Sequence, residues 1–330
     1  MQKLFLLSLM AVHGSVYAMS FSHLDWEMAC DNTHTCRMAG YQADENPPIS
    51  LLLTYPAGAK ATLTGNIQLL DAPKQANLWI NGKNQGVINF KQAKAQLSKE
   101  QLNKILATAK QNSQIELKSA QHVWRLSDRG LSAVLLKADV YQKRVGTTSA
   151  LSAKGNQNSN RVRASAAMPS YRIAQYTRGK AQHYALNAVQ AKALMPLLKK
   201  ATTEDDCPNL WQGNDLEGAK LTIYPINTKH VLVERPCWHG AYNFGAGMWL
   251  MSKDLKKVQQ LVTVSASSFS EGQIFSSHKG RGIGDCNTID EWVFTGQRFM
   301  PSYRAVNLQC KGFAGGAWDL TTLVSKVSYS

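Results

Sequence analysis

The chain has 330 residues, of which 44% are hydrophobic and 18% are charged, and its formal net charge is +15. This hydrophobic content is enough for packed cores, so it excludes a chain that is disordered throughout. The positive charge comes from a shortage of acidic residues. A surface with this excess of positive charge attracts polyanionic partners over a Debye length of ~8 Å. The alternative is that the charge only serves solubility.

Residues 1–18 are typical of a secretory signal peptide. Lys3 supplies the positive charge, Leu4–Val12 form the apolar core, and the small residues Val16 and Ala18 precede a cleavage site. A membrane anchor needs about 20 apolar residues, and no later stretch is longer than this one. We therefore expect cleavage after Ala18 and a periplasmic or secreted protein with no transmembrane segment in the mature chain.

Residues 19–145 are expected to form an N-terminal α+β module. Apolar runs bounded by Pro, Gly and Asn predict strands over 24–30, 35–41, 49–55, 62–70, 76–80, 114–117 and 122–126. Ser98 and Gln101 have the spacing of a capping box at the start of a helix. A second helix is predicted to start at a cap formed by Ser127 or Asp128. Its buried stripe should contain Leu131, Val134, Leu135 and Ala138.

Residues 146–180 have a different composition, rich in Ser, Ala, Asn, Gln and Thr, and they lack periodicity. No acid occurs between Asp139 and Glu204. The stretch contains Arg161, Arg163, Arg172, Arg178 and Lys180, among other bases. The composition predicts a solvated, basic, low-complexity linker. The same residues also fit a basic arm that follows an anionic polymer, and the two interpretations are compatible.

Residues 181–330 are expected to form a C-terminal β-rich module. A helix is predicted over 185–200, and Pro196 within it predicts a kink or an early end. Eight short strands then suggest a meander, sandwich or partial barrel. They span 220–224, 230–234, 247–251, 259–264, 291–294, 297–300, 305–310 and 319–324. The predicted class is α+β and β-rich, with a sandwich-like first module and a disulfide-stapled antiparallel second module.

An even number of cysteines behind a signal peptide predicts disulfides, and none of the spacings is that of a Cys-x-x-Cys metal site. The cysteines are Cys30, Cys36, Cys207, Cys237, Cys286 and Cys310. If the two halves fold separately, Cys30 must pair with Cys36, and three pairings remain for the other four. Among these we favour the sequential pairs, Cys207 with Cys237 and Cys286 with Cys310.

The stretch from 278 to 286 contains the candidate binding site. Its glycine amides, next to two cations, have the composition of a loop that cradles an anion. The alternative is a tight loop that precedes a disulfide-bonded cysteine. The candidate anion-binding residues are His278, Lys279, Gly280, Arg281, Gly282 and Gly284. No catalytic, metal-binding or cofactor-binding residues are predicted, and no cofactor is expected.

An enzymatic alternative combines Cys286 as nucleophile with His278 as base, in a cell-wall-active hydrolase or transferase. Asp285 directly precedes this cysteine and would raise the pKa of its thiol, and an oxidised cysteine has no thiol at all. A non-enzymatic protein is therefore the stronger expectation.

Several segments resemble a bacterial family of exported six-cysteine proteins of unknown function, domain-of-unknown-function family 1176. The matching segments are Trp26-x3-Cys30-x5-Cys36, Cys237–Asn243, Lys279–Cys286, and Trp292-x-Phe294-x-Gly296-x2-Phe299 with Cys310. More loosely, the first half is similar to proteins named for invasion-associated locus B. The resemblance implies export, a cysteine framework and a fold, but it carries no catalytic residues over to this chain.

The expected function is that of an exported envelope protein, non-enzymatic, that binds an anionic envelope component or has a structural role. The candidate partners are lipopolysaccharide, peptidoglycan and anionic lipid, with DNA as a further candidate and any protein partner unknown. A third hypothesis is an inhibitor of a host hydrolase such as lysozyme. Lysozymes are typically basic, so charge repulsion would slow the encounter with a basic inhibitor.

Overall fold

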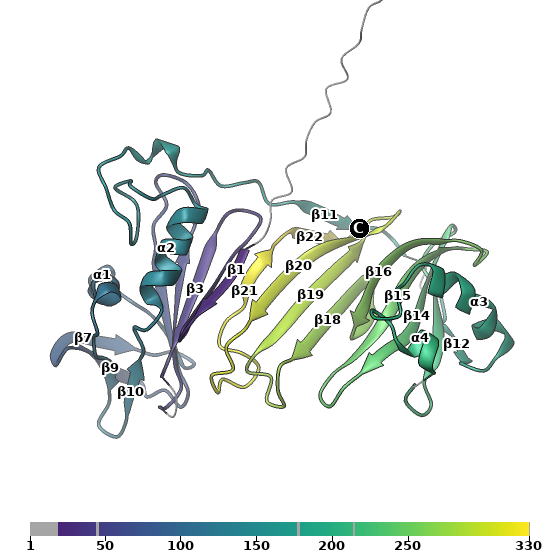
Figure 1. Ribbon diagram of the computed structural model, residues 1–330, viewed down its shortest axis with the longest axis horizontal. Coiled ribbons are helices and arrows are strands. Elements are labelled where there is room, and N and C mark those ends of the chain that lie inside the picture. Colours follow the sequence, from purple (N-terminus) through teal and green to yellow (C-terminus); the bar gives the residue numbers. More distant parts are fainter. Residues whose placement is uncertain (1–18, 44–45, 177–178, 214, 330) are drawn as a thin grey trace, which may run out of the picture.

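The computed structural model describes residues 19–43, 46–176, 179–213 and 215–329, so the predicted signal peptide lies outside the described residues. The chain forms an N-terminal module of strands and helices and a C-terminal module of strands with short helices at its far end (Figure 1). The predicted α+β, β-rich class is confirmed.

The N-terminal module contains two antiparallel sheets. The six-stranded sheet has the order β1-β2-β3-β4-β5-β8. Its strands are Met19–His23 (β1), Trp26–Cys30 (β2), Cys36–Tyr41 (β3), Ile49–Tyr55 (β4), Thr64–Leu69 (β5) and Lys94–Gln96 (β8). The four-stranded sheet has the order β10-β9-β6-β7. Its strands are Gln75–Ile80 (β6), Lys83–Asn89 (β7), Ile115–Lys118 (β9) and Val123–Leu126 (β10).

Helix α1 (Lys99–Ala107) begins at the predicted capping box and continues into a 3₁₀ turn, η1 (Thr108–Lys110). The Gln101 N–H donates to the Ser98 hydroxyl at 3.2 Å, and the Ser98 N–H donates to the Gln101 side chain at 3.1 Å. These two bonds satisfy amides that the first helical turn leaves without partners, which is why the local sequence is sufficient to place this helix.

Helix α2 (Leu131–Tyr141) begins later than the sequence predicts. Its N-cap is Gly130, with φ of 102°, and no side chain caps it, so the predicted cap at Ser127 or Asp128 is wrong. The Asp128 carboxylate accepts the Ser113 N–H at 2.7 Å instead, so a tertiary contact occupies the group that would have capped the helix. The predicted stripe of α2 is buried as expected, and it consists of Leu131, Val134, Leu135 and Ala138.

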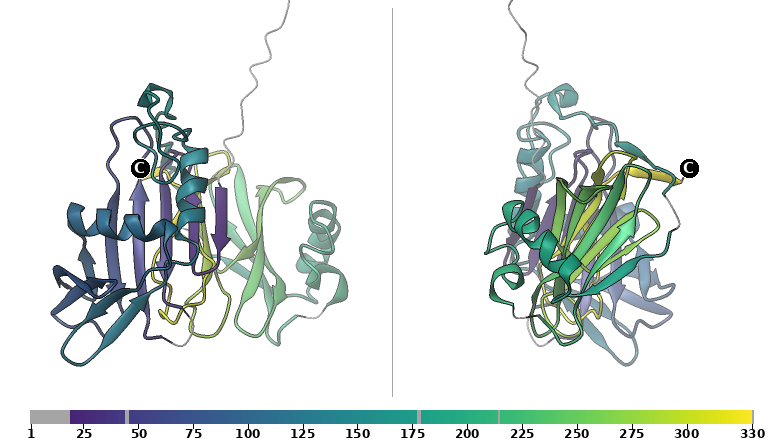
Figure 2. Two further views of the ribbon diagram at one scale, coloured as in Figure 1. Left: turned by 60° about the vertical axis from the view of Figure 1, so that its left-hand side comes forward. Right: turned by 90° about the vertical axis from the view of Figure 1, so that its right-hand side faces the viewer.

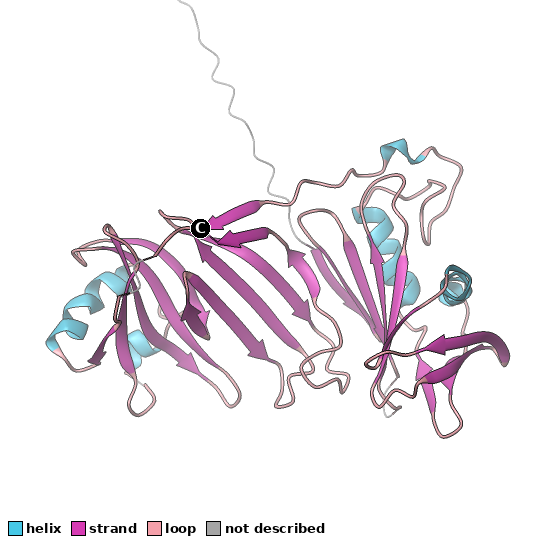
Figure 3. Cartoon of the chain, turned by 180° about the vertical axis from the view of Figure 1, so that it is seen from behind, coloured by secondary structure: helices cyan, strands magenta, loops and turns pink. Residues whose placement is uncertain are grey.

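Residues 146–176, which we call the crossing segment, run from the end of α2 along the upper edge of the molecule to the C-terminal module (Figures 1 and 3). The segment includes a 3₁₀ turn, η2 (Ser159–Arg161), and a strand, β11 (Ser170–Ile173). Strand β11 pairs in parallel with β22 (Lys326–Tyr329), close to the end of the chain.

The crossing segment differs from the flexible linker that its composition predicts. The carboxylate of Asp139, which is fully buried in α2, accepts backbone N–H groups from Leu151 at 2.8 Å, Ser152 at 2.7 Å and Ala153 at 3.1 Å. Val162 is also buried. Composition gives no sign of this order because the partner of the segment, a carboxylate on a helix, lies outside it.

The C-terminal module contains two five-stranded sheets of antiparallel pairs. The first has the order β12 to β16. Its strands are Gln182–Ala185 (β12), Lys220–Pro225 (β13), His230–His239 (β14), Phe244–Ser252 (β15) and Val258–Ala266 (β16). The second has the order β17 to β21. Its strands are Ser268–Ser270 (β17), Gln273–Lys279 (β18), Asn287–Phe294 (β19), Phe299–Asn307 (β20) and Leu320–Leu323 (β21).

Helices α3 (Val189–Lys200) and α4 (Asn209–Gln212) pack on the outer face of the first of these sheets. Residues 182–185, partly assigned to a helix from the sequence, form strand β12 instead. Helix α3 continues through Pro196 and ends at Lys200, so the early end predicted at this proline is wrong. The predicted strands over 297–300 and 305–310 merge into the continuous strand β20.

The C-terminal module has cores on both sides of its first sheet. Leu232 of β14 packs with Ile274, Phe294 and Phe299 between the two sheets. Its neighbours Val231 and Val233 point to the other side, into a core covered by α3 and α4. Because side chains alternate along a strand, a strand buried on both faces has a continuous apolar sequence, as β14 does.

The two modules share a buried interface, visible in Figure 2 as the contact of the yellow strands with the six-stranded sheet. Strand β2 directs Trp26 and Met28 into the N-terminal core and directs Ala29 to the opposite face. There, Ala29 packs with Leu320 of β21, and Lys311 forms an ion pair of 2.9 Å with Asp25. One face of the sheet is therefore covered by α1 and α2, and the other by the C-terminal module.

The cysteines form three disulfides, Cys30–Cys36, Cys207–Cys237 and Cys286–Cys310. These are the sequential pairs that we favoured from the sequence. Among the helices of the described ranges, none is long and apolar enough to cross a membrane.

Candidate functional site

The candidate anion-binding residues lie at the junction between β18 and β19. His278 and Lys279 are the last residues of β18 and pair with Thr288 and Asn287 of β19. The loop itself begins only at Gly280. Two of the six candidate residues are therefore held in a strand.

The glycine amides of this loop are largely used within it. The Gly280 N–H donates to the Cys286 carbonyl at 2.8 Å, and the Gly284 N–H donates to the Arg281 carbonyl at 2.8 Å. An anion would have to displace these bonds to reach the amides, so the loop is closer to the tight turn that the sequence offered as the alternative than to an open cradle.

Arg281 is bound to an acid of its own loop. Its Nε–H donates to Asp285 at 2.7 Å, and a second guanidinium nitrogen donates to the other carboxylate oxygen. That carboxylate also accepts the Gly312 N–H at 2.6 Å, and the Arg281 guanidinium holds the pKa of Asp285 below its usual range. The charge of Arg281 is thus balanced by a buried carboxylate. Both cations of the candidate set are exposed, but among the described residues only Arg281 has an acidic partner, and Lys279 has none.

The Lys279 backbone ties the loop to the neighbouring β14–β15 turn. Its N–H donates to the Asn243 side-chain oxygen at 2.8 Å, and its carbonyl accepts from the Asn243 amide nitrogen at 2.8 Å. Tyr242, Phe244 and Ile283 are exposed beside this contact. The surface around Lys279 is therefore partly apolar and carries little net charge.

The proposed nucleophile, Cys286, is bonded to Cys310. The side chain therefore presents no thiol, and the ring of His278 packs edge-on against Trp238, with 5.0 Å between ring centroids. Asp285, Cys286 and Cys310 also place potential metal-ligand atoms within 4.8 Å of one another. Because the two sulfurs are bonded to each other, they offer no thiolate to a metal ion.

The crossing segment is the larger basic surface. Lys154, Arg161 and Arg172 are exposed on it, and Arg163 is half-buried over the ring of Tyr141, 4.7 Å from its centroid. Within the described part of the chain, none of these cations forms an ion pair with an acid. Arg178 lies outside the described residues.

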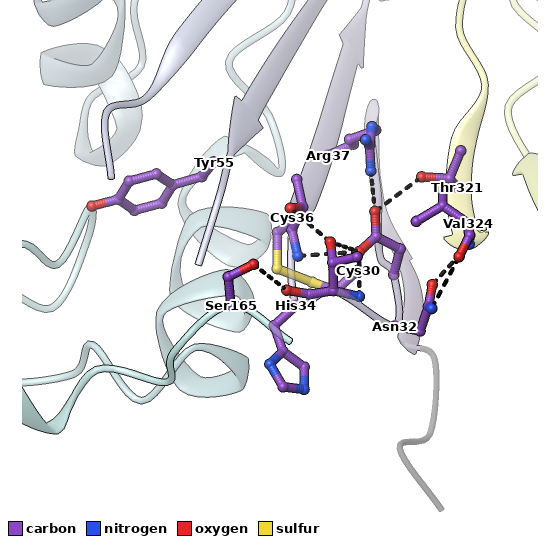
Figure 4. Close-up of polar contacts among 12 residues, drawn as sticks. Cys30, Asn32, His34, Cys36, Arg37, Tyr55, Ser165, Thr321 and Val324 are labelled. Atoms are coloured by element: carbon purple, nitrogen blue, oxygen red, sulfur yellow. Dashed lines mark hydrogen bonds and ion pairs between the residues drawn. A yellow bond between two sulfur atoms is a disulfide. The ribbon is translucent and has the colours of Figure 1, made fainter. Parts of the chain in front are cut away.

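Figure 4 shows where the crossing segment is fixed to the β2–β3 turn, which the Cys30–Cys36 disulfide closes. Asp31 organises this turn: its carboxylate accepts from the Thr33 N–H at 2.8 Å and from Arg37 at 2.7 Å. The Ala166 N–H then donates to the Thr33 carbonyl at 3.3 Å. The segment therefore has a defined course above this turn.

A family comparison matches residues 20–325 to the family described as "Protein of unknown function (DUF1176)". The chain belongs to this family. The match includes all six cysteines and both modules, so the resemblance predicted from sequence motifs is confirmed. The DUF1176 description assigns no activity.

Two further comparisons add little to the DUF1176 assignment. No curated protein matches the chain. Among solved structures, the invasion associated protein B from Bartonella henselae is 15% identical, covers 38% of this chain and 99% of its own, and has a TM-score of 0.27. At that TM-score the likeness carries no structural or functional argument.

Proposed function

We propose that the protein is an exported, non-enzymatic binding protein for an anionic component of the bacterial envelope, with the crossing segment as its main contact surface. The observation that supports this most is the acid-free run between Asp139 and Glu204, which includes the whole crossing segment and presents Lys154, Arg161 and Arg172 to solvent. Export is proposed from residues 1–18 and is compatible with three disulfides, which persist in oxidising compartments.

The structure of the crossing segment favours binding over simple solubility. A flexible basic linker would lose conformational entropy on contact with a polymer, whereas this segment is already fixed by Asp139 and by the β2–β3 turn. Each exposed base near an anionic surface contributes about 1 kcal/mol. Several of them along one edge would give salt-sensitive binding to a polyanion.

The β18–β19 loop has a smaller part in this proposal than the sequence suggested. Arg281 is balanced by Asp285, so Lys279 is the cation of the described loop residues that has no acidic partner. The disulfide at Cys286 also argues against the hydrolase or transferase alternative, because that chemistry needs a thiolate.

The test is co-sedimentation of the mature protein with purified lipopolysaccharide, peptidoglycan, anionic vesicles and DNA across a salt series. We compare the wild type with Arg161→Glu/Arg172→Glu and with a control of equal charge change, Lys253→Glu/Lys257→Glu, on the β15–β16 turn. A Lys279→Glu variant tests the loop without breaking the Arg281–Asp285 pair.

Salt-sensitive binding to one component, weakened by the crossing-segment variant and retained by the control, would support the proposal and name the partner. Equal losses of binding in both double variants would show that binding depends only on net charge, and this would overturn the assignment of the crossing segment. A larger loss for Lys279→Glu would move the site to the β18–β19 loop. Binding to none of the four components would overturn the function itself.

A further inference from the structure

A groove of about 870 Å³ lies between helix α1 and residues 148–154 of the crossing segment. Ligand sites in proteins typically measure about 300–1,000 Å³. The groove is therefore large enough for a small-molecule ligand, and nothing in the sequence motifs pointed to it.

One wall of the groove is a single face of α1 and η1. The lining residues Lys99, Leu102, Asn103, Leu106 and Lys110 recur three, four or seven residues apart, which is the spacing of one helical face. The two lysines at its ends lie about 18 Å apart along the axis, at a rise of about 1.5 Å per residue in α1 and about 2.0 Å per residue in η1. This face is apolar in the middle and cationic at both ends.

The opposite wall has the same character. Leu63 and Ala61 follow β4, and Leu151 comes from the crossing segment; all three are partly buried against the N-terminal core and also line the groove. Lys154 adds a third cation, and no acid is among the lining residues. The lining combines apolar side chains with uncharged polar ones, and all of its charged side chains are cationic, which is complementary to a ligand that has an apolar body and a negative charge.

The crossing-segment wall is formed before any ligand binds. Asp139 accepts three consecutive backbone N–H groups from residues 151–153, and the Tyr55 hydroxyl donates to the Ser149 carbonyl at 2.7 Å. A wall held by four hydrogen bonds to Asp139 and Tyr55 keeps its place without a ligand. Binding would therefore cost little ordering of the protein.

We propose that this groove binds the acyl chain of an anionic lipid, with the phosphate of its headgroup paired with a lysine at the rim. A polyanion without an apolar part would leave Leu63, Leu106 and Leu151 exposed to water, and an uncharged lipid would leave the three lysines without a partner. The proposal rests on the proposed function for the sign of the ligand charge. The lipid proposal goes beyond the proposed function because it assigns a separate site and a class of lipid.

The experiment titrates the mature chain with four probes in a calorimeter, each below its critical micelle concentration. Dodecyl phosphate has both the chain and the charge; dodecylphosphocholine and dodecyl maltoside have the same chain without net charge; butyl phosphate has the charge with a short chain. Dodecyl phosphate should bind in a 1:1 complex, and the other three should bind at least about tenfold more weakly, which corresponds to ~1.4 kcal/mol.

Two variants locate the site. Ala107 is exposed, lines the groove and ends α1. Ala107→Glu places a negative charge among the lysines and should weaken dodecyl phosphate binding by roughly tenfold, whereas Ala107→Gln, of equal size, should weaken it much less. Lys99→Gln/Lys110→Gln should also weaken binding, while Lys104→Gln/Lys91→Gln, which removes the same charge outside the groove, should not. Unfolding midpoints of all variants confirm that they fold.

Equal binding of dodecyl phosphate and butyl phosphate would overturn the role of the acyl chain, and equal binding of dodecyl maltoside would overturn the role of the charge. Unchanged binding by folded Ala107→Glu would show that the lipid binds elsewhere and overturn the site. Failure here is separable from failure of the proposed function. Arg161→Glu/Arg172→Glu should leave dodecyl phosphate binding intact, and Ala107→Glu should leave sedimentation with peptidoglycan and DNA, which have no acyl chain, unchanged.

Discussion

The indole ring of Trp26 covers Gly40, its cross-strand partner in β3. A Cβ atom built on Gly40 would lie 2.2 Å from Trp26 Cε2, so only glycine leaves room for the ring. The indole N–H donates to the Ser127 carbonyl at 2.8 Å. The pair therefore links the centre of the six-stranded sheet to the segment that precedes α2.

Gly40→Ala should lower the free energy of unfolding by about 1–3 kcal/mol, because the added methyl group overpacks a fully buried ring. Chemical denaturation measures the change. Gly240→Ala is the control, since a Cβ there meets its nearest atom only at 4.0 Å. Equal effects of the two substitutions would contradict the assigned role of Trp26.

Glu27 should make stability depend on pH. It is fully buried at the interface between the modules, and loss of solvation raises the pKa of its carboxyl above 4.5, although hydrogen bonds from Tyr41 at 2.6 Å and from the Leu308 N–H at 2.7 Å oppose this. The folded chain therefore holds this proton more tightly than the unfolded chain does. The contribution of Glu27 to stability is complete below pH 4.5 and is lost as pH rises through the raised pKa.

The measurement compares the free energies of unfolding of the wild type and Glu27→Gln from about pH 4 to about pH 7. The advantage of the wild type over the variant should shrink as pH rises, because glutamine does not titrate. Glu217→Gln, at an exposed position, should show no such trend. A difference for Glu27→Gln that grows with pH would reverse the assigned sign.

Asp285 should show the opposite dependence. The Arg281 guanidinium and the Gly312 N–H stabilise its charged form and keep its pKa below 3.8. Its contribution to stability is therefore complete above pH 3.8 and is lost as pH falls through the lowered pKa. Asp285→Asn should cost about 1–3 kcal/mol near neutral pH and less in acid. A double-mutant cycle with Arg281→Gln should show coupling, and additive effects would mean that the pair contributes nothing to stability.

Asp139→Asn should loosen residues 151–153, because an amide group cannot accept three backbone N–H bonds with both of its terminal atoms. Hydrogen exchange at the Leu151, Ser152 and Ala153 amides should accelerate, and the crossing segment should become more sensitive to proteases. Asp254→Asn, on an exposed turn, is the matched control. Unchanged exchange at these amides would show that the segment is held by other contacts.

The disulfides should differ in their contribution to stability. In the chain-entropy description, Cys207–Cys237, with a sequence separation of 30, stabilises more than Cys30–Cys36, with a separation of 6. Replacing each pair by alanine should cost about 3.6 kcal/mol for the first and about 2.2 kcal/mol for the second. Chemical denaturation of the two double variants measures the loss in free energy of unfolding. A larger loss for the Cys30–Cys36 replacement would show that native packing, and not loop closure, determines the contribution of each disulfide.

The sequence by itself determined the features that depend on near neighbours. The capping box at Ser98 and Gln101, the buried stripe of α2 and the strand Ile49–Tyr55 follow from residues within one or two turns or along one run, so propensity and periodicity are sufficient to find them. The six cysteines and the segment Lys279–Cys286 likewise identified the family.

Tertiary structure decided everything that depends on a distant partner. Asp139 orders a segment that has the composition of a linker, Asp285 neutralises Arg281 in the loop selected as the anion site, and β21 buries the second face of β2. The lipid-sized groove likewise arises only because residues 148–154 fold back over α1. Burial and charge pairing across long sequence separations are properties of the folded chain, so the local sequence pattern does not predict them.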